Sequence, residues 1–542
     1  MRLGLASKLN PTLVCVLISV SLGACSDAPE EPTMAKDRTD SQITVNTLNG
    51  ALTGEKLARG IHVYRGLPYA KPPVGELRWR PPEAHPAWSG VRDAATFSAS
   101  CTQPTHASTF VWKRGGFEVS EDCLYLNVWT KSDARDLPVM VWFHGGAHTS
   151  GQGHSQIFDG ENLASLDVVI ITINYRLGAL GFLAHPWLSD ESDHDSSGNY
   201  GLLDKIAALN WVRDNVEQFG GNPDNVTIFG QSAGSQSVCS LMASPLAEGL
   251  FHKAIGQSAA CLDAAPRRDM TGRERGKQLV DELSISDLAS LRKVSPERIL
   301  IAAERSGWSN ASRIVIDGWV LEEPQIDTFR EGRQAQVPLM VGCLADEGVG
   351  LFPVNETLTE AELNAYLTRL AGDQASAIEA AYAQALEASA GTIQHAIATD
   401  LFMAFAMRRW AEYQHRTAQP TYLYFMDHVP PAFHLYMPED PDMKLAGGPR
   451  PAAYHSGDLA FVFANTGKVG LHWNEDDHAL SRMMAHYWTN FARTGNPNGK
   501  GLVEWRPFEA EEFTTQRLNS SPESVPGVRR ARLDLLAKAN PL

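Results

Sequence analysis

Ser232 stands in a sequence context that could make it a nucleophile. Residues 219–234 read FGGNPDNVTIFGQSAG, a glycine-rich turn followed by the β-type run 226–229 and then by the pattern G-x-S-x-G. Small residues around a serine let the chain turn sharply between a strand and a helix and expose the hydroxyl, as in a nucleophile elbow. The chemistry would be acyl transfer through a covalent intermediate. Because G-x-S-x-G also occurs in ordinary turns, the groups that would assist the serine must be sought elsewhere.

An oxyanion needs hydrogen-bond donors, and the segment His144-Gly145-Gly146-Ala147 can supply them. It follows the apolar run 138–143, and its glycines let backbone N–H groups turn towards a bound oxygen without a Cβ in the way. With the N–H of Ala233, the residue after the serine, this loop predicts an oxyanion hole with three donors. The structural alternative is a plain turn at the end of a strand.

A serine nucleophile also needs a base and an acid that orients the base, and both follow the serine in this kind of fold. Asp346 and Glu347 come after the predicted strand 338–343, and either could be the acid by position alone. The candidate base is His455, which lies in a predicted turn before an apolar run. Later histidines lie in charged or helical sequence and are expected to be structural: His472, His478 and His486.

Alternating strands and helices must position these residues. Apolar runs typical of buried strands occur at 124–129, 138–143, 166–174, 226–229, 253–257 and 338–343. Apolar residues at helical spacing predict a helix over 204–219, and the alternation favours an α/β fold with a mostly parallel sheet. Hairpin-like sequence at 43–54, followed by β character at 61–69, indicates a mixed sheet. The helix-rich intervals 262–335 and 355–420 are expected to be insertions at the carboxyl edge of the sheet, where such folds bind ligands.

Composition and charge limit the classes of function. The chain has 542 residues, of which 43% are hydrophobic, so it can bury a large core. Its formal net charge of −16 argues against a nucleic-acid partner. No linker-like sequence interrupts the chain after the first part, and we therefore expect one domain over residues 43–542.

The N-terminal segment 1–24 has the pattern of an export signal. Arg2 and Lys8 precede an uncharged stretch, residues 9–26, whose apolar core is too short for a membrane span. The stretch ends Leu-Gly-Ala-Cys at Cys25, an order that resembles a bacterial lipobox and implies lipidation of that cysteine. Residues 25–42 are expected to be a flexible tether. The predicted location is the periplasm or, through the lipid anchor, the outer membrane, and a plain secretory signal is the alternative.

Motifs in order along the chain resemble those of the type-B carboxylesterases, the family that includes the cholinesterases. The serine signature fits at every fixed position. The segment 121–128 (EDCLYLNV) fits the second signature of the family, and the chain departs from that signature only at Lys131. Further landmarks are YRGLPYAKPPVGELRW (64–79), NYRLGALGFL (174–183), GNYGLLDKIAALNWVRDNV (198–216) and FARTGNPN (491–498). The resemblance begins near Gly50 and implies an α/β-hydrolase fold whose helical insertions form an active-site gorge.

The resemblance also implies roles for single residues. It selects Glu347 rather than Asp346 as the acid, and His455 as the base that serves Ser232. It assigns the oxyanion donors to the N–H groups of Gly146, Ala147 and Ala233. Other residues receive a role or a partner only from the resemblance: Ser258 as a serine close to the triad, Cys101–Cys123 as a disulfide, and Arg65–Glu121 and Arg176–Asp204 as ion pairs.

Two residues depart from the family pattern. Ala147 replaces the commoner third glycine of the oxyanion loop, so the N–H remains while the methyl group narrows the acyl side. Gln231, which we expect to lie close to the triad, replaces the glutamate that often precedes the serine. The change removes a negative charge beside the nucleophile, which argues against specialisation for quaternary ammonium substrates.

The cysteines agree with export. Five follow Cys25, an odd number, so at least one thiol should be free even in an oxidising compartment. Cys239 and Cys261 are a candidate second pair, and Cys343 is expected to be a buried thiol. The acidic stretch 190–195 lacks the ligand spacing of a calcium site and is expected to be a solvated loop.

Taken together, the residues predict an exported serine esterase that acts on a small-molecule ester and needs no cofactor or metal. Phe110, Trp112 and Phe117 are candidates to line the mouth of its gorge. Two alternatives remain open: the same machinery specialised for an amide, a lactone or a bulky multi-ester, and a catalytically silent adhesion module. The presence of the complete set Ser232, Glu347 and His455 argues against the silent module.

Overall fold

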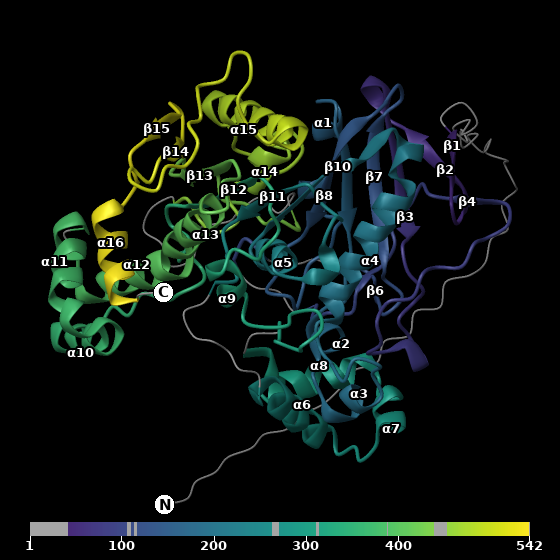
Figure 1. Ribbon diagram of the computed structural model, residues 1–542, viewed down its shortest axis with the longest axis horizontal. Coiled ribbons are helices and arrows are strands. Elements are labelled where there is room, and N and C mark those ends of the chain that lie inside the picture. Colours follow the sequence, from purple (N-terminus) through teal and green to yellow (C-terminus); the bar gives the residue numbers. More distant parts are fainter. Residues whose placement is uncertain are drawn as a thin grey trace, which may run out of the picture. The chain divides into compact units, whose positions relative to one another are not determined.

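A large mixed sheet runs through the part of the chain that the computed structural model describes, namely residues 42–105, 110–112, 116–262, 270–310, 314–386, 388–437 and 452–540 (Figure 1). The predicted signal peptide and most of the tether lie outside these residues. The strand order is β1-β2-β3-β7-β9-β8-β10-β11-β12-β13-β14-β15, with β4 beside β2. The strands are β1 (Gln42–Thr47), β2 (Gly50–Lys56), β3 (Ile61–Pro68), β4 (Val91–Asp93), β7 (Tyr125–Lys131), β8 (Leu137–Phe143), β9 (Val169–Ile173), β10 (Gly221–Gln231), β11 (Lys253–Gln257), β12 (Leu339–Leu344), β13 (Thr421–Met426), β14 (Thr515–Leu518) and β15 (Glu523–Val525).

The sheet is mixed and mostly parallel, as the sequence predicts. Strands β9, β8, β10, β11, β12, β13 and β14 pair in parallel, and β4 pairs in parallel with β2. The pairs β1–β2, β2–β3, β3–β7, β7–β9 and β14–β15 are antiparallel. The register aligns Phe143 with Gly230, Gln231 with Gln257, and Gln257 with Gly342. The loops that follow β8, β10 and β12 therefore leave the sheet at one edge, which brings the predicted oxyanion loop, serine and acid together.

Two apolar cores cover the two faces of the sheet. Side chains alternate between faces along a strand, so Val139 and Val141 of β8 point to one core while Met140 and Trp142 point to the other. The first core contains side chains of α4 (Tyr200–Asn215), α5 (Ala233–Met242) and α13 (Phe405–His415), and the second contains those of α14 (Leu459–Val462) and α15 (Glu475–Thr494). This three-layer arrangement confirms the predicted α/β-hydrolase architecture.

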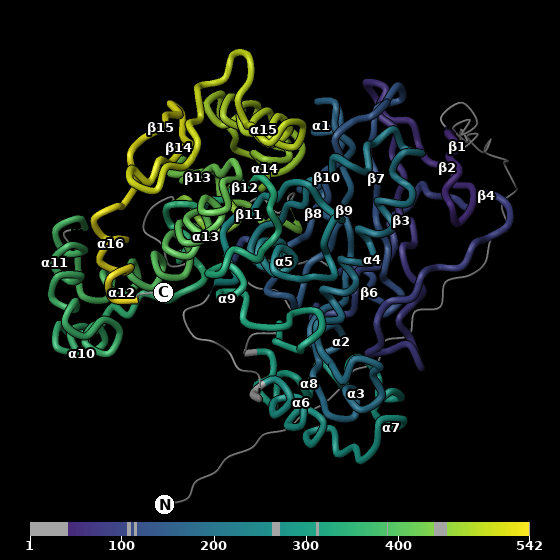
Figure 2. Tube along the Cα trace, viewed as in Figure 1, coloured from purple at the N-terminus to yellow at the C-terminus, as the bar shows by residue number. Residues whose placement is uncertain are grey.

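Both helix-rich intervals are insertions between parallel strands. Helices α6 (Met270–Leu283), α7 (Leu288–Arg292), α8 (Pro296–Arg305) and α9 (Gln325–Arg330) lie between β11 and β12 in the chain. Helices α10 (Glu360–Ala371), α11 (Ala375–Leu386) and α12 (Ala390–Thr399) precede α13, and they gather with α16 (Arg530–Ala539) (Figure 2). Strands β13 to β15 had no sequence prediction; β13 is fully buried and begins directly after the helix-rich interval 355–420.

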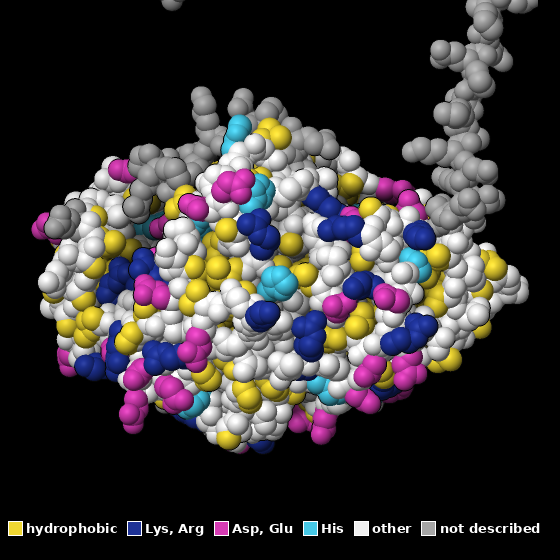
Figure 3. Space-filling view, turned by 90° about the horizontal axis from the view of Figure 1, so that it is seen from above, with side chains coloured by type: hydrophobic (Ala, Val, Ile, Leu, Met, Phe, Trp, Pro, Cys, Tyr) yellow, Lys and Arg dark blue, Asp and Glu magenta, His cyan; other side chains and the backbone are white. Residues whose placement is uncertain are grey.

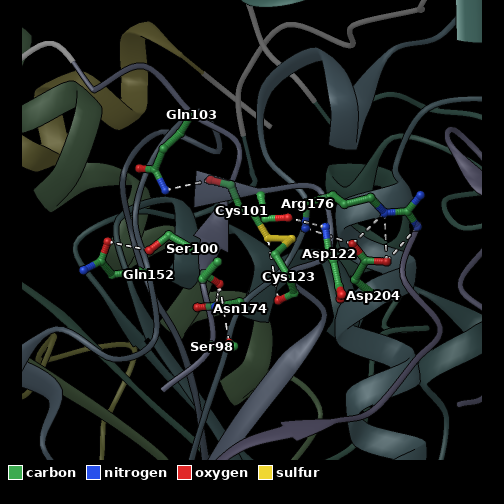
Figure 4. Close-up of a disulfide and its surroundings, with 12 residues drawn as sticks. Ser98, Ser100, Cys101, Gln103, Asp122, Cys123, Gln152, Asn174, Arg176 and Asp204 are labelled. Carbon is green, nitrogen blue, oxygen red and sulfur yellow. Dashed lines mark hydrogen bonds and ion pairs between the residues drawn. A yellow bond between two sulfur atoms is a disulfide. The ribbon is translucent and has the colours of Figure 1, made fainter. Parts of the chain in front are cut away.

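Two disulfides join residues of the described chain. One links Cys101 and Cys123, the pair that the family resemblance implies, and it lies beside the buried ion pair Arg176–Asp204 (Figure 4). The other links Cys239 and Cys261, while the thiol of Cys343 is free and buried. Disulfides persist in oxidising compartments, so both bonds fit a periplasmic or extracellular location.

One predicted ion pair is wrong. Arg65 does not contact Glu121; its guanidinium lies 2.6 Å from a carboxylate oxygen of Glu55 on the neighbouring strand β2. Glu121 instead binds Arg78, whose Nε donates to Glu121 at 2.7 Å. The reason is burial. Arg78 is 6% exposed, and a guanidinium removed from water needs a charged partner. Arg65 is more accessible to water and needs such a partner less.

The surface charges and the acidic stretch 190–195 bear on whether the chain has a charged binding patch or a metal site. On the face in Figure 3, basic and acidic side chains of the described residues are interspersed rather than gathered by sign. No group of three or more His, Cys, Asp or Glu residues in the described chain is placed to hold a metal ion, and the stretch 190–195 is no exception. Within the same residues, every helix is too short or too polar to cross a bilayer.

Candidate active site

Ser232 occupies a strained corner between β10 and α5. Its φ and ψ angles are 57° and −126°, a region that non-glycine residues rarely adopt and that is found at nucleophile elbows. Its backbone N–H donates to the carbonyl of Gln257 at 2.8 Å, which ties the corner to β11. A Cβ at Gly234 would lie 1.9 Å from the carbonyl oxygen of Phe143, so the elbow can pack on the end of β8 only if this residue is glycine.

The predicted acid and base meet beside this corner. Glu347 follows β12 and is fully buried; its Oε1 accepts from the N–H of Leu344 at 2.8 Å, and its Oε2 lies 2.5 Å from Nδ1 of His455. Asp346, the alternative acid by position, turns the other way and accepts from the N–H of Ala453 at 2.9 Å. Asp346 therefore ties down the loop that carries His455, and Glu347 binds the imidazole itself.

The second imidazole nitrogen faces the serine loop. Nε2 of His455 lies 3.2 Å from the side-chain nitrogen of Gln231. Because Nδ1 donates its hydrogen to the Glu347 carboxylate, Nε2 must be the acceptor and the Gln231 amide the donor. Among the hydrogen bonds of the described residues, the partner of Nε2 is thus Gln231 and not the adjacent Ser232.

Hydrogen bonds and a stacked pair of rings hold the predicted oxyanion loop in place. The hydroxyl of Tyr175 donates to the carbonyl of His144 at 2.7 Å, and the two rings stack with centroids 4.3 Å apart. The carbonyl of Gly146 accepts from the N–H groups of Thr149 and Ser150, both at 3.0 Å. No hydrogen bond within the described chain uses the N–H groups of Gly146, Ala147 or Ala233, so these donors are available to a ligand.

A cavity of about 310 Å³ joins these groups. Trp112 forms part of its wall, with its ring centroid 5.9 Å from that of His455 and its indole N–H donating to Ser456. Of the other aromatics proposed for the mouth, Phe110 is buried against Tyr454, and Phe117 is not in the wall. The lining residues are Pro104, Trp112, Gly145, Gly146, Ala147, Thr149, Ser150, Phe158, Gln231, Ser232, Leu351, Leu435, Tyr436, His455, Ser456 and Leu459.

Comparison with known proteins decides the family. The sequence profile of the carboxylesterase family matches residues 41–535. This chain belongs to the carboxylesterase family. It is a carboxylic ester hydrolase, and the resemblance found in its motifs is confirmed.

Similar proteins span almost the whole carboxylesterase. It is 34% identical to a fumonisin B1 esterase of Sphingopyxis macrogoltabida, over 94% of this chain and 93% of that one. It is 36% identical to the human cocaine esterase, over 89% and 88% of the two chains. Among solved structures, a carboxylesterase of Geobacillus stearothermophilus superposes with a TM-score of 0.78 at 32% identity, covering 91% of this chain and 99% of the other.

Asp458 is a buried carboxylate of this carboxylesterase that sequence reasoning missed. Its Oδ2 accepts from Nε2 of Gln257 at 2.7 Å and from the hydroxyl of Tyr424 at 3.3 Å. The pKa of Asp458 is raised to about 6, mainly by burial and also by the nearby Glu347 carboxylate, against the opposing effect of these hydrogen bonds and of His455. Its position three residues after His455 was the available signal, but a spacing says nothing about burial.

Replacing Asp458 with asparagine should change how stability depends on pH. The pKa of Asp458 is about 6 in the folded chain and 3.8 as its ordinary value, so between these values the folded state holds a proton that the unfolded state has lost. The wild type therefore loses stability as pH rises from about 4 to about 6, whereas asparagine does not titrate. The variant should gain about 3 kcal/mol relative to the wild type across this window.

Thermal midpoints of both proteins from pH 4 to pH 7 measure this difference. Asp224→Asn, at an exposed aspartate, is the matched control and should run parallel to the wild type. A constant difference between Asp458→Asn and the wild type over the whole range would show that Asp458 is ionised throughout.

Ser258, which was expected close to the triad, lies in the loop after β11. It is fully buried, has a φ of 54°, and its N–H donates to the carbonyl of Gly342 at 2.8 Å. Its hydroxyl has no hydrogen-bond partner among the described residues. The structure thus places Ser258 against β12, without a hydrogen bond to the triad.

Proposed function

We propose that Ser232 attacks the carbonyl carbon of a carboxylic ester, with His455 as the general base and Glu347 as the acid that orients it. The observation that carries the proposal is the 2.5 Å contact between Nδ1 of His455 and Oε2 of Glu347, because His455 and Ser232 line the same cavity. The buried carboxylate fixes the tautomer in which Nε2 can accept a proton from the serine and stabilises the imidazolium that forms. The alcohol leaves as an acyl-enzyme forms, and His455 then activates the water that releases the acid.

The N–H groups of Gly146, Ala147 and Ala233 would stabilise the oxyanion. They are available donors beside Ser232, and they come from two different segments that meet at the edge of the sheet. Fixed donors aimed at the developing charge lower the barrier because they need no reorganisation during the reaction. This chemistry requires no cofactor.

The preferred substrate would be an uncharged ester. The described residues that line the cavity include no Lys, Arg, Asp or Glu, and the wall is made mostly of apolar side chains and backbone. A carboxylate buried there without a cationic partner would lose its hydration at a cost of several kcal/mol. The second candidate is the bulkier multi-ester that the sequence leaves open, and the relatives named fumonisin B1 esterase and cocaine esterase suggest two esters with which to test it.

A matched pair of substrates tests this preference. The p-nitrophenyl ester of pentanoic acid and the mono-p-nitrophenyl ester of glutaric acid have acyl chains of similar length, but only the second carries a carboxylate. The neutral ester should have a kcat/KM at least about 100-fold higher. Equal values, or a preference for the charged ester, would show that a cation reaches the acyl group. Hydrolysis of neither ester would contradict the proposal for the site as a whole.

Export and domain organisation are proposed from the sequence. Residues 1–24 would be a signal peptide, Cys25 a lipidation site, residues 25–42 a tether and residues 43–542 a single hydrolase domain. The two disulfides support an oxidising compartment. The mass of the N-terminal peptide of the mature protein distinguishes a lipidated Cys25 from a plain cleavage.

A further inference from the structure

The oxyanion loop has a strained backbone that something must hold in place. Gly146, Ala147 and His148 have φ angles of 105°, 53° and 55°, three consecutive residues in the region that favours glycine. Two of them carry a Cβ, and each such residue costs about 1–3 kcal/mol. Strain of this kind persists only where the surrounding contacts fix the backbone.

His148 makes the contacts that fix it. The residue is 2% exposed. Its carbonyl accepts from the N–H of Gly178 at 2.7 Å, and its ring packs on Phe182 with centroids 5.1 Å apart. Nε2 of the ring lies 3.1 Å from Oγ of Ser237. His148 is therefore bound at both its backbone and its side chain, and the side-chain bond leads to a different element.

That element is α5, whose first residue is Ala233. Oγ of Ser237 donates to the carbonyl of Ala233 at 2.9 Å, one helical turn earlier. A hydroxyl has one hydrogen, and Ser237 gives it to Ala233, so Nε2 of His148 carries the hydrogen of the bond to Ser237. Two hydrogen bonds thus connect the residue after Ala147 with Ala233.

We propose that His148 and Ser237 are positioning residues that hold the oxyanion loop against the first turn of α5. The three oxyanion N–H groups belong to these two segments, so the connection sets the distance between the donors of Gly146 and Ala147 and that of Ala233. The inference rests on the oxyanion assignment of the proposed function. A displacement of about 1 Å among such groups can lower a rate by about 100-fold.

Three variants separate the hydrogen bond from the packing of the ring. His148→Phe keeps a ring against Phe182 but removes the N–H, His148→Gln places an amide N–H near the position of Nε2, and Ser237→Ala removes one oxygen atom. Each is assayed for kcat and KM on a neutral p-nitrophenyl ester, and for the affinity of an alkyl trifluoromethyl ketone, which forms an oxyanion on the serine.

His148→Phe and Ser237→Ala should each lower kcat by about 10–100-fold with KM within about threefold, because donors that act on the oxyanion are used mainly in the transition state. The affinity for the ketone should fall by the same factor. The kcat of the double variant should lie within about threefold of the kcat of the poorer single variant, since the two residues act through one connection. His148→Gln should recover at least a third of wild-type kcat.

A remote histidine–hydroxyl pair provides the matched control. Nδ1 of His478, on α15, lies 2.8 Å from Oγ1 of Thr466, and His478→Phe should leave kcat within about twofold of the wild type. A kcat within twofold of the wild type in Ser237→Ala would overturn the proposal, and this small change answers the question even if His148→Phe does not fold. Equal losses in His148→Phe and His148→Gln would also overturn it. Loss of activity in Ser232→Ala tests the proposed function separately, whatever these variants show.

Discussion

Replacing Ser232 with alanine is expected to lower kcat for a neutral p-nitrophenyl ester by about 10⁵–10⁶-fold. Alanine keeps the small size that the elbow needs but removes the atom that would form the acyl-enzyme under the proposed mechanism. The little activity that remains would come from the oxyanion donors and from binding of the ester, which alone still exceed the rate in water. Steady-state kinetics with purified wild type and variant measures the loss.

A serine on the helix that follows Ser232 gives the control for this substitution. Ser240 of α5 is buried, and its Oγ accepts from Nε2 of Gln325 at 3.3 Å, away from the cavity. Ser240→Ala should keep kcat within about threefold of the wild type. An active Ser232→Ala variant, or an inactive wild type, would mean that the reaction does not proceed through this serine.

Replacing Glu347 with glutamine should have the second largest effect, a fall of about 10²–10⁴-fold in kcat. Glutamine has nearly the same volume, but its amide has no charge to stabilise the imidazolium of His455 and no longer enforces the tautomer with a free Nε2. KM should change little, because Glu347 is fully buried and does not line the cavity.

Asp346→Asn is the natural comparison because it makes the same chemical change one residue away. Asp346 accepts from the backbone of Ala453, and an asparagine oxygen can accept the same bond, so kcat should stay within about tenfold of the wild type. If Asp346→Asn were the more damaging of the two, the acid of the triad would have been assigned to the wrong residue.

This pair shows how far the sequence leads. The order of serine, acid and histidine, and the positions of the loops after strands, could be predicted because apolar runs mark the parallel strands and glycines mark the turns. Position alone could not choose between Asp346 and Glu347, because two adjacent side chains of a turn point in different directions. Family resemblance chose Glu347, and the contacts of both residues agree with that choice.

The features that escaped prediction depend on contacts across the fold. The buried carboxylate of Asp458 and the connection of His148 with Ser237 join segments that are up to about 200 residues apart, and neither has a local pattern. The expected pair Arg65–Glu121 failed for the same reason, since which carboxylate a guanidinium finds is decided by burial and by the neighbouring strand. Strand β13 was missed because its partners β12 and β14 lie far away in the sequence. Strands β14 (Thr515–Leu518) and β15 (Glu523–Val525) pair with each other nearby, but each is too short to show a pattern.

The hydrogen bond from Gln231 to Nε2 of His455 has a kinetic meaning of its own. A single lone pair on that nitrogen can accept either the glutamine amide or the serine hydroxyl. If His455 is the base, as proposed, the Gln231 amide must leave Nε2 before the serine hydroxyl can bind there, and turnover would equal the intrinsic rate multiplied by the fraction of molecules in which Nε2 is free. Under that condition, an ester that accepts a hydrogen bond from the Gln231 amide would free the base as it binds.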